Sequence, residues 1–347
     1  MSILLIAFGV SFLITLIATP LLGRLAPLVG AFDQPSPRRI NKKPVANLGG
    51  VAIYLGILAG ILFNTSQGTL IMGILVGSTI IALVGLWDDL VGLSPGWKLA
   101  GQILAALALL PFGVEIQFVT NPLGGMIFLG AWGAPLTVLW VVGITNTVNF
   151  IDGLDGLAAG VAAIASGTLA IVALQEGQMG AAVMALIIAG SSLSFLIFNF
   201  HPARIFMGDS GAMLLGFILA TTSVIGALKS ATAMTILVPV LALGVPIADT
   251  LLAIVRRSTN GHSIALADRD HIHHRLLRLG YSHRGAVLVV YGTTFFLGSM
   301  AILINSVRGL ESFMLLGLAG VVVGLGGWRM GIFRLKKPTG EKTYPHL

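Results

Sequence analysis

The apolar run TLIMGILVGSTIIALVGLW, residues 69–87, is followed at once by the acidic pair Asp88-Asp89. About 20 apolar residues are enough for a helix to cross a bilayer. The run therefore predicts a membrane-spanning helix, and the two carboxylates mark the point where it leaves the lipid. Long apolar runs separated by short polar breaks recur along the whole chain, so this segment is typical of the fold.

Reading the chain in this way predicts eleven spans. They cover approximately residues 3–22, 48–64, 69–87, 98–113, 134–148, 157–174, 180–198, 211–228, 233–255, 286–305 and 312–332. Between the fourth and fifth spans, residues 114–133 alternate around an Asn-Pro-Leu-Gly-Gly turn and predict a short external β-hairpin.

The composition is typical of an integral membrane protein. Of 347 residues 56% are apolar and 10% charged, against about a quarter charged in soluble domains. This balance excludes an ordinary soluble enzyme, a disordered chain and a nucleic-acid-binding domain, despite the net charge of +7. Without Cys there is no disulfide and no thiolate nucleophile. We expect an all-α polytopic membrane protein, a single integral-membrane domain over 1–347, with spans within 3–332 and a cytoplasmic tail over 333–347.

The charges predict an orientation. If the loops after the odd-numbered spans face the cytoplasm, they hold every Lys and Arg except Lys229 and Arg308. The N-terminus is then outside and the C-terminus inside. All the Asp and all seven His fall on the same cytoplasmic side. Because acidic residues contribute little to orientation, this bias indicates that the cytoplasmic loops carry the chemistry.

The first candidate group is Asp88-Asp89, with Lys98 nine residues after Asp89. Adjacent carboxylates at a membrane boundary repel each other unless a cation or a shared proton lies between them. Three readings stay open at this point: a hydrated pair at a helix end, a metal site, or a base beside a lysine that binds phosphate.

The second group spans the end of the fifth span and the loop after it. Asn146, Asn149 and Asp152 recur every three residues and should line one face of the helix. Asp155 follows, either as a functional carboxylate or as the N-cap of the next span. Four polar side chains in ten residues of a membrane protein exceed what capping requires.

A third group joins the seventh and eighth spans and contains Asn199, Phe206 and Asp209. An ionised Asp at a helix N-terminus suits a hard cation bridging to phosphate oxygens. Phe206 could stack on a nucleotide base or could simply pack. Asp249, inside the ninth span, is a functional candidate by its depth or a structural partner of a residue such as Arg256.

The last group is DRDHIHHRLLR, residues 268–278. Its histidines His271, His273 and His274 could bind zinc, or the loop could merely be solvated. Without Cys, and with arginines nearby, a phosphate- and sugar-binding cluster is favoured. These arginines are Arg269, Arg275, Arg278 and Arg284.

Together these groups favour phosphoryl-type transfer between a cytosolic nucleotide-linked donor and a lipid acceptor. The main competing class is a proton-coupled secondary transporter, which would place ionisable groups near the midplane and show repeat symmetry. Here the ionisable groups gather at one face and no repeat is visible. The chain also lacks a Walker motif and the Asp-Gly-x-x-Ala-Arg motif of alcohol phosphotransferases.

In their order along the chain, these motifs resemble those of the polyprenyl-phosphate N-acetylhexosamine-1-phosphate transferases of glycosyltransferase family 4. The resemblance runs from about residue 20 to 332. The histidine loop is similar to the branch that transfers GlcNAc-1-phosphate from UDP-GlcNAc to undecaprenyl phosphate and starts O-antigen, common antigen or wall teichoic acid. The alternative is the MurNAc-pentapeptide branch of peptidoglycan synthesis, which typically has three consecutive His where this chain has Ile272 inserted. One departure is Ala46, where the family usually has Pro.

The resemblance implies roles for individual residues. Asp209 would hold Mg²⁺ (or Mn²⁺) on the donor diphosphate, which Asn149 would support. Lys98 would bind phosphate, Asp155 would contact uracil and Phe206 would stack on it. Asp88 and Asp89 would organise the lipid phosphate and metal, with Asp88 the candidate base. The candidate substrate-binding residues are Lys42, Lys98, Asn146, Asn149, Asp152, Asp155, Asn199, Phe206, His271, His273, His274 and Arg275.

The resemblance also implies the surroundings of the protein. The substrates would be a UDP-HexNAc and undecaprenyl phosphate, the remaining partners membrane lipids, and no nucleic acid is expected. The protein would be a multi-pass protein of the bacterial inner or plasma membrane with its active site on the cytoplasmic face. Its apolar, Gly-rich spans would permit a homodimer without requiring one.

Overall fold

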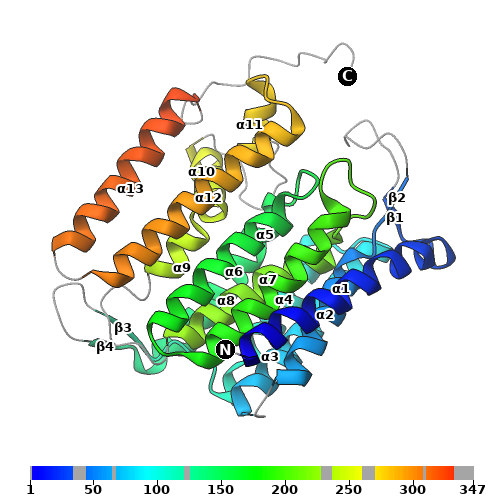
Figure 1. Ribbon diagram of the computed structural model, residues 1–347, viewed down its shortest axis with the longest axis horizontal. Helices are drawn as coiled ribbons and strands as arrows, with labels where there is room; N and C mark the ends of the chain where they lie inside the picture. Colours follow the sequence, from blue (N-terminus) through cyan, green and yellow to red (C-terminus); the bar gives the residue numbers. More distant parts are fainter. Residues whose placement is uncertain are drawn as a thin grey trace.

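The computed structural model describes residues 2–33, 44–64, 68–120, 126–227, 237–259, 270–307 and 310–331. Within these ranges the chain is almost entirely helical, with two antiparallel pairs of short strands (Figure 1). Lys42, Asp268 and Arg269, all named in the sequence analysis, lie outside the described residues.

Eight helices among the described residues are long and apolar enough to cross a membrane. They are α1 (Ser2–Val29), α3 (Thr69–Val91), α5 (Gly133–Ile151), α6 (Leu157–Gln175), α7 (Met179–Asn199), α8 (Gly208–Ala227), α12 (His283–Ser306) and α13 (Leu310–Arg329). This finding confirms the class of an all-α polytopic membrane protein. The count of eleven spans and the orientation of the termini stay predictions.

The other three predicted spans form shorter or interrupted helices. Two are α2 (Gly49–Asn64) and α4 (Pro95–Leu107), the latter followed by a 3₁₀ turn, η1 (Leu110–Phe112). The run 233–255 contains α9 (Leu237–Ala242) and α10 (Gly244–Thr259). They are separate helices because Pro246 lies in the first turn of α10, and proline has no N–H to continue the helical ladder across the junction.

The hairpin predicted within 114–133 is present. Strand β3 (Phe118–Thr120) pairs antiparallel with β4 (Met126–Phe128), and the rings of Phe118 and Phe128 meet edge to face. A second pair, β1 (Phe32–Asp33) and β2 (Val45–Ala46), was not predicted from sequence, because each strand has only two residues.

Helices α6, α7 and α8 form the buried centre of the molecule, and more than seven tenths of the spanning window of each is buried. Helix α8 packs against α3 and α5, while α6 packs against α7 and α12. The short helix α11 (Ile272–Arg278) lies beyond α12, at the end of the bundle opposite the β3–β4 hairpin (Figure 1). The polar motifs of the sequence gather at this α11 end.

Candidate active site

An acid–lysine cluster, formed by Asp88, Lys98 and Asp209, joins three helices. The ammonium of Lys98, from α4, lies 2.5 Å from the Oδ2 atom of Asp88 on α3. The same ammonium hydrogen-bonds to Oδ2 of Asp209, at the start of α8. Lys98 and Asp209 remain about a quarter and a third exposed, so the cluster is accessible from outside the bundle. The structure thus brings Asp209 to the predicted group of Asp88 and Lys98.

Asp89 has a different environment from its neighbour Asp88. Its Oδ1 atom accepts a hydrogen bond from the backbone N–H of Asp209 (2.8 Å). Its Oδ2 atom accepts from the backbone N–H (3.1 Å) and the hydroxyl (2.6 Å) of Ser210. Asp89 therefore caps the N-terminus of α8 from another helix, satisfying donors that have no partner inside α8.

Gly208 makes this capping contact possible. Its φ is +70°, in the left-handed region, and a Cβ at this position would lie 2.4 Å from Oδ2 of Asp89. A side chain would therefore displace the capping carboxylate as well as strain the backbone. The Gly in the sequence Met-Gly-Asp is explained by the approach of Asp89.

The two carboxylates of the acid–lysine cluster, together with that of Asp89, fit a hard divalent cation. Asp88, Asp89 and Asp209 bring one carboxylate oxygen each within 4.8 Å of one another. Oxygen ligands of this kind suit Mg²⁺ or Mn²⁺ rather than softer ions. Both oxygens of Asp89 accept hydrogen bonds, and both oxygens of Asp88 also have partners, the N–H of Leu93 (2.6 Å) and the ammonium of Lys98. A cation held by Asp88 and Asp209 would therefore bind oxygens that contact Lys98.

The polar face of α5 also forms as predicted, with a partner that the sequence analysis missed. The side-chain amides of Asn146 and Gln102 bond to each other in both directions, at 2.5 and 3.2 Å. Gln102 lies four residues after Lys98 on α4, and this spacing could have revealed that the two share a helix face. Asn149 lies one turn beyond Asn146, beside the same cavity.

Asp152 follows the end of α5, in a loop where negative charge accumulates. Burial, together with the charges of Asp209 and Asp89, raises the pKa of Asp152 to about 7. From sequence, this carboxylate is expected to continue the polar stripe of Asn146 and Asn149. The influence of the Asp209 charge shows that Asp152 lies at the same end of the bundle.

The loop between α7 and α8 is held by Asn199. This side chain is buried, donates to the carbonyl of Ile205 (2.9 Å) and accepts from the backbone N–H of Gly156 (3.0 Å). Its amide therefore fixes two loops. Phe206, which follows Ile205, is partly exposed, and its N–H donates to the carbonyl of Ala46 (2.8 Å). The loop that contains the departure Ala46 thus forms a β-bridge to residue 205.

Asp155 is not an N-cap of α6: the N-cap residue is Gly156, and no side chain bonds there. Its Oδ2 atom instead lies 2.7 Å from Nδ1 of His201 and accepts from the N–H of Ala203. His283, at the start of α12, stacks on His201 with ring centroids 4.0 Å apart. Neither His201 nor His283 was predicted as a site residue from sequence.

Asp249 and the histidine loop are directly connected. The buried Asp249 lies 2.7 Å from Nδ1 of His271 and accepts from the N–H of Ile272 (2.7 Å), at the start of α11. Asp249 thus has a structural partner, which is His271 and not the expected Arg256. His271 in turn stacks on Phe150 of α5.

His273 is the most buried of the three histidines. It is 2% exposed, and neither ring nitrogen has a hydrogen-bond partner among the described residues. Burial and the neighbouring His274 lower its pKa to about 3. Its Nε2 atom packs on Gly153, where an added Cβ would lie 2.1 Å away. This histidine is therefore neutral at physiological pH, while His274 beside it is more exposed.

Three arginines of the predicted phosphate cluster that lie among the described residues, Arg275, Arg278 and Arg284, have partners within the protein. Asp270 pairs with Arg275 (2.5 Å), Arg278 and Arg256 (3.4 Å). Arg284 donates two hydrogen bonds to the carbonyl of His201, at 2.9 and 3.1 Å. Lys98 also has carboxylate partners, but it lines the cavity, and Arg275, Arg278 and Arg284 do not, so Lys98 is the cation better placed to meet a substrate phosphate.

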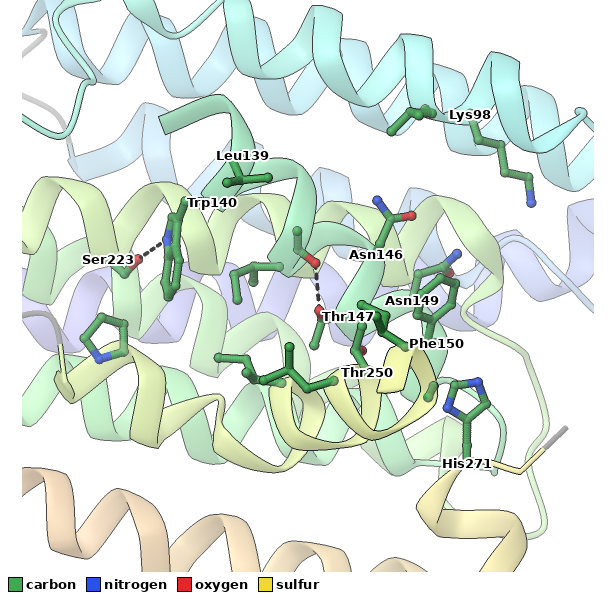
Figure 2. Close-up of a pocket in the computed structure, with 18 of the residues that line it drawn as sticks. Lys98, Leu139, Trp140, Asn146, Thr147, Asn149, Phe150, Ser223, Thr250 and His271 are labelled. Carbon is green, nitrogen blue, oxygen red and sulfur yellow. Dashed lines mark hydrogen bonds between the residues drawn. The ribbon is translucent and has the colours of Figure 1, made fainter. Parts of the chain in front are cut away.

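A cavity of about 1150 Å³ runs along α5, between α4 and α10. Figure 2 shows Lys98, Asn146, Asn149 and His271 toward one end of it and Leu139, Trp140 and Ser223 toward the other. Apart from the hydrogen bond between Trp140 and Ser223 (3.0 Å), the second end is largely apolar. The cavity thus joins the acid–lysine cluster to a long hydrophobic surface.

The chain is similar to known proteins over most of its length. The model described as "Glycosyl transferase family 4" matches residues 71–227. The chain is 43% identical over 303 residues (87% of this chain, 85% of the relative) to a probable undecaprenyl-phosphate N-acetylglucosaminyl 1-phosphate transferase of Bacillus subtilis. It is 38% identical over 310 residues (80% and 78%) to a decaprenyl-phosphate N-acetylglucosaminephosphotransferase of Mycobacterium leprae. A phospho-N-acetylmuramoyl-pentapeptide-transferase of Bacillus mycoides is 31% identical over 326 residues (87% and 98%).

Proposed function

The chain belongs to glycosyl transferase family 4, and from this premise we propose that it transfers GlcNAc-1-phosphate from UDP-GlcNAc to undecaprenyl phosphate. A phosphate oxygen of the lipid forms a bond to the β-phosphorus of the donor. The bond from that phosphorus to the bridging oxygen breaks, and UMP leaves with the electron pair. The products are undecaprenyl-pyrophosphoryl-GlcNAc and UMP.

The observation that carries this proposal is the position of Lys98, which contacts Asp88 and Asp209 and also lines the polar end of a cavity with an apolar continuation. A polyprenyl phosphate has the same division into an anionic head and a hydrocarbon tail. The tail would lie along Leu139 and Trp140, with the phosphate at Lys98. This placement brings the attacking oxygen next to the residues that bind the donor diphosphate.

The remaining polar residues would orient the donor. Asn149 lines the cavity and would support the diphosphate, while the partly exposed Phe206 would stack on uracil. His274, beside the neutral His273, would contact the sugar phosphate. Mg²⁺, when bound by Asp209 with Asp88, would offset the negative charge on the diphosphate oxygens.

The role of Asp88 in proton transfer is limited by the substrate itself. A lipid phosphate is already anionic at neutral pH, so holding the two phosphates in line contributes more than removing a proton. Asp88 keeps Lys98 in place and is the candidate base, whereas Asp89 positions Asp209 through the N-terminus of α8. A covalent phosphosugar on an Asp is the minority alternative.

The branch of the family is a further part of the proposal. The GlcNAc assignment draws on the relatives from Bacillus subtilis and Mycobacterium leprae, and the MurNAc-pentapeptide alternative on the more distant relative from Bacillus mycoides. We place the active site on the cytoplasmic face of the bacterial plasma membrane, because the basic residues favour that side. A homodimer stays a prediction.

A transfer assay tests the proposal. Purified protein in detergent receives undecaprenyl phosphate, Mg²⁺ and, separately, UDP-GlcNAc, UDP-GalNAc or UDP-MurNAc-pentapeptide, with UMP and lipid product both measured. We expect UMP and product from UDP-GlcNAc, both lost on chelation. If UDP-MurNAc-pentapeptide is the only one of the three donors that gives turnover, the protein belongs to the peptidoglycan branch instead. Absence of UMP with all three donors, in folded protein, would reject the reaction.

A further inference from the structure

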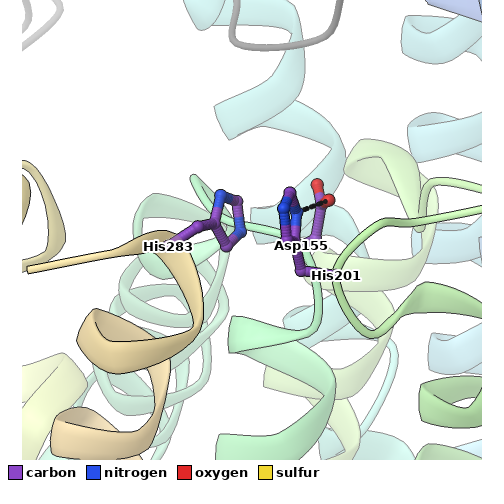
Figure 3. A group of neighbouring side chains, drawn as sticks. All are labelled: Asp155, His201 and His283. Carbon is purple, nitrogen blue, oxygen red and sulfur yellow. Dashed lines mark hydrogen bonds and ion pairs between the residues drawn. The ribbon is translucent and has the colours of Figure 1, made fainter.

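A second cluster of possible metal ligands lies outside the acid–lysine cluster. Asp155, His201 and His283 each offer a ligand atom, and the three atoms lie within 4.8 Å of one another. Figure 3 shows the three side chains converging from different elements: the α5–α6 loop, the α7–α8 loop and the first turn of α12. No step of the proposed transfer involves either histidine.

The hydrogen bonds determine which nitrogen of His201 is free. Its Nδ1 atom lies 2.7 Å from Oδ2 of Asp155. Because an ionised carboxylate only accepts hydrogen bonds, Nδ1 carries the proton and Nε2 carries the lone pair. The carbonyl of His201 is fixed by Arg284, so the backbone that presents this ring is also held.

In His283, as in His201, Nε2 is the ring nitrogen without a hydrogen-bond partner in the part of the chain that the structure describes. Its ring hydrogen-bonds to the backbone of Asp155. Its Nε2 atom is buried and has no hydrogen-bond partner among the described residues, so Nδ1 is the atom that bonds. A buried nitrogen with an unused lone pair is costly unless a ligand occupies it. Both imidazoles are thus oriented by Asp155, and both keep Nε2 free.

This arrangement is the one that metal-binding histidines adopt. A ligating histidine usually donates its other N–H to a carboxylate or a backbone carbonyl, which fixes the ring and its tautomer. Stacking of the two rings, 4.0 Å apart and 16° from parallel, further favours neutral imidazoles, since two imidazolium rings would repel. Neutral imidazole is the form that binds metal.

We propose that His201 and His283, both oriented by Asp155, bind a transition-metal ion of the Zn²⁺ class through their Nε2 atoms, independently of the cation at Asp88 and Asp209. Imidazole nitrogens favour zinc and its neighbours, whereas a set made of carboxylates favours Mg²⁺. Water completes the coordination, because Asp155 accepts the Nδ1–H of His201 and is therefore not itself a ligand. The ion joins the start of α12 to the α7–α8 loop beside the acid–lysine cluster, and therefore holds these elements together.

Zinc binding tests the proposal directly. Metal-free protein without an affinity tag, kept in excess Mg²⁺, is titrated with Zn²⁺ against a chromophoric chelator. We expect one tightly bound Zn²⁺ per chain and a thermal unfolding midpoint raised by Zn²⁺. His201→Ala and His283→Ala should each weaken binding by about 100-fold and abolish the thermal shift. His346→Ala, in the C-terminal tail, is the matched control and should bind as the parent does.

The outcomes separate this site from the alternatives. Zinc retained in both variants but lost in Asp209→Asn would place the ion at the acid–lysine cluster and overturn the proposal, as would a parent protein that binds no zinc. The zinc-free unfolding midpoint of each variant shows whether it is folded, and His283→Gln, which keeps the side-chain volume, replaces His283→Ala if that variant is not. Failure of the transfer assay leaves this test unaffected, because binding is measured without substrate.

Discussion

The N-termini of α8 and α11 are both held by aspartates from other helices, yet the two caps differ. Asp89 uses both oxygens on α8, accepting from Asp209 and Ser210, which lie 120 and 121 residues away. Asp249 divides its oxygens between the N–H of Ile272, 23 residues away, and the ring of His271. The first cap fixes a helix, whereas the second fixes a helix and a side chain together.

The difference shows how a carboxylate can serve a site without reacting. Asp89 places Asp209 beside Lys98, and Asp249 places the histidine loop beside α5. In each case a partly exposed residue lies in the capped turn, Asp209 in α8 and His274 in α11. Changes at the capping and the capped residues should therefore separate stability from activity.

The largest expected effect is that of Asp209→Asn, which keeps the shape of a residue at the capped end of α8. We expect a loss of turnover of about 1000-fold, because a charged oxygen beside Lys98 and the donor diphosphate is lost. The thermal midpoint should change little, since the backbone N–H groups of α8 still bond to Asp89. UMP release and thermal unfolding measure the two effects. Glu311→Gln on α13 is the matched control, and substantial turnover by Asp209→Asn would exclude its assignment as the metal ligand.

The second-largest effect is expected from substitutions that remove the cap of α8. Asp89→Ala leaves three buried donors of Asp209 and Ser210 without a partner, which should destabilise the fold by about 3 kcal/mol. Gly208→Ala should have a similar effect, because its Cβ would occupy the position of the Asp89 carboxylate. The double variant tests the cause. If the two changes act on one contact, their combined loss measured in the thermal midpoint is well below the sum, whereas full additivity would contradict the explanation of Gly208.

Asp249→Ala should have a smaller effect on stability, about 2 kcal/mol, because it removes one backbone and one side-chain hydrogen bond. It frees the ring of His271, so the KM for the UDP-sugar should rise as well. Asp249→Asn retains an acceptor for Ile272 and should recover most of the stability. A variant with normal stability and normal KM would show that the α11 cap has no influence on the loop.

The smallest effect is a pH dependence from His273. Its pKa is about 3 in the folded protein, well below the ordinary value near 6.5, so between these values the unfolded chain binds more protons than the folded one. Stability is therefore lost as the pH falls through 6.5. Between pH 7.5 and 6 the loss from this residue should be about 1 kcal/mol. His273→Asn should lower the slope of the thermal midpoint against pH, and an unchanged slope would show that the ring is solvated.

Much of the site could be predicted from local patterns. The pairing of Asp88 with Lys98 follows from two charges on either side of a short Pro-Gly turn, and the face shared by Asn146 and Asn149 follows from helical spacing. The roles of Asp89 and Asn199 could not, because their partners are backbone groups of other segments. Nothing in their sequence neighbourhood distinguishes a capping carboxylate or a loop-holding amide from a substrate ligand.

The sequence by itself determined that this is a polytopic membrane protein of one enzyme family, since the length of apolar runs and the order of polar motifs are properties of the chain. Only the tertiary structure decided that Asp89 caps α8, that Asp270 occupies the arginines, and that His201 and His283 meet at Asp155. The physical reason is that a hydrogen bond depends on which donors lie within about 3 Å. Packing brings together residues that the chain separates by a hundred positions or more.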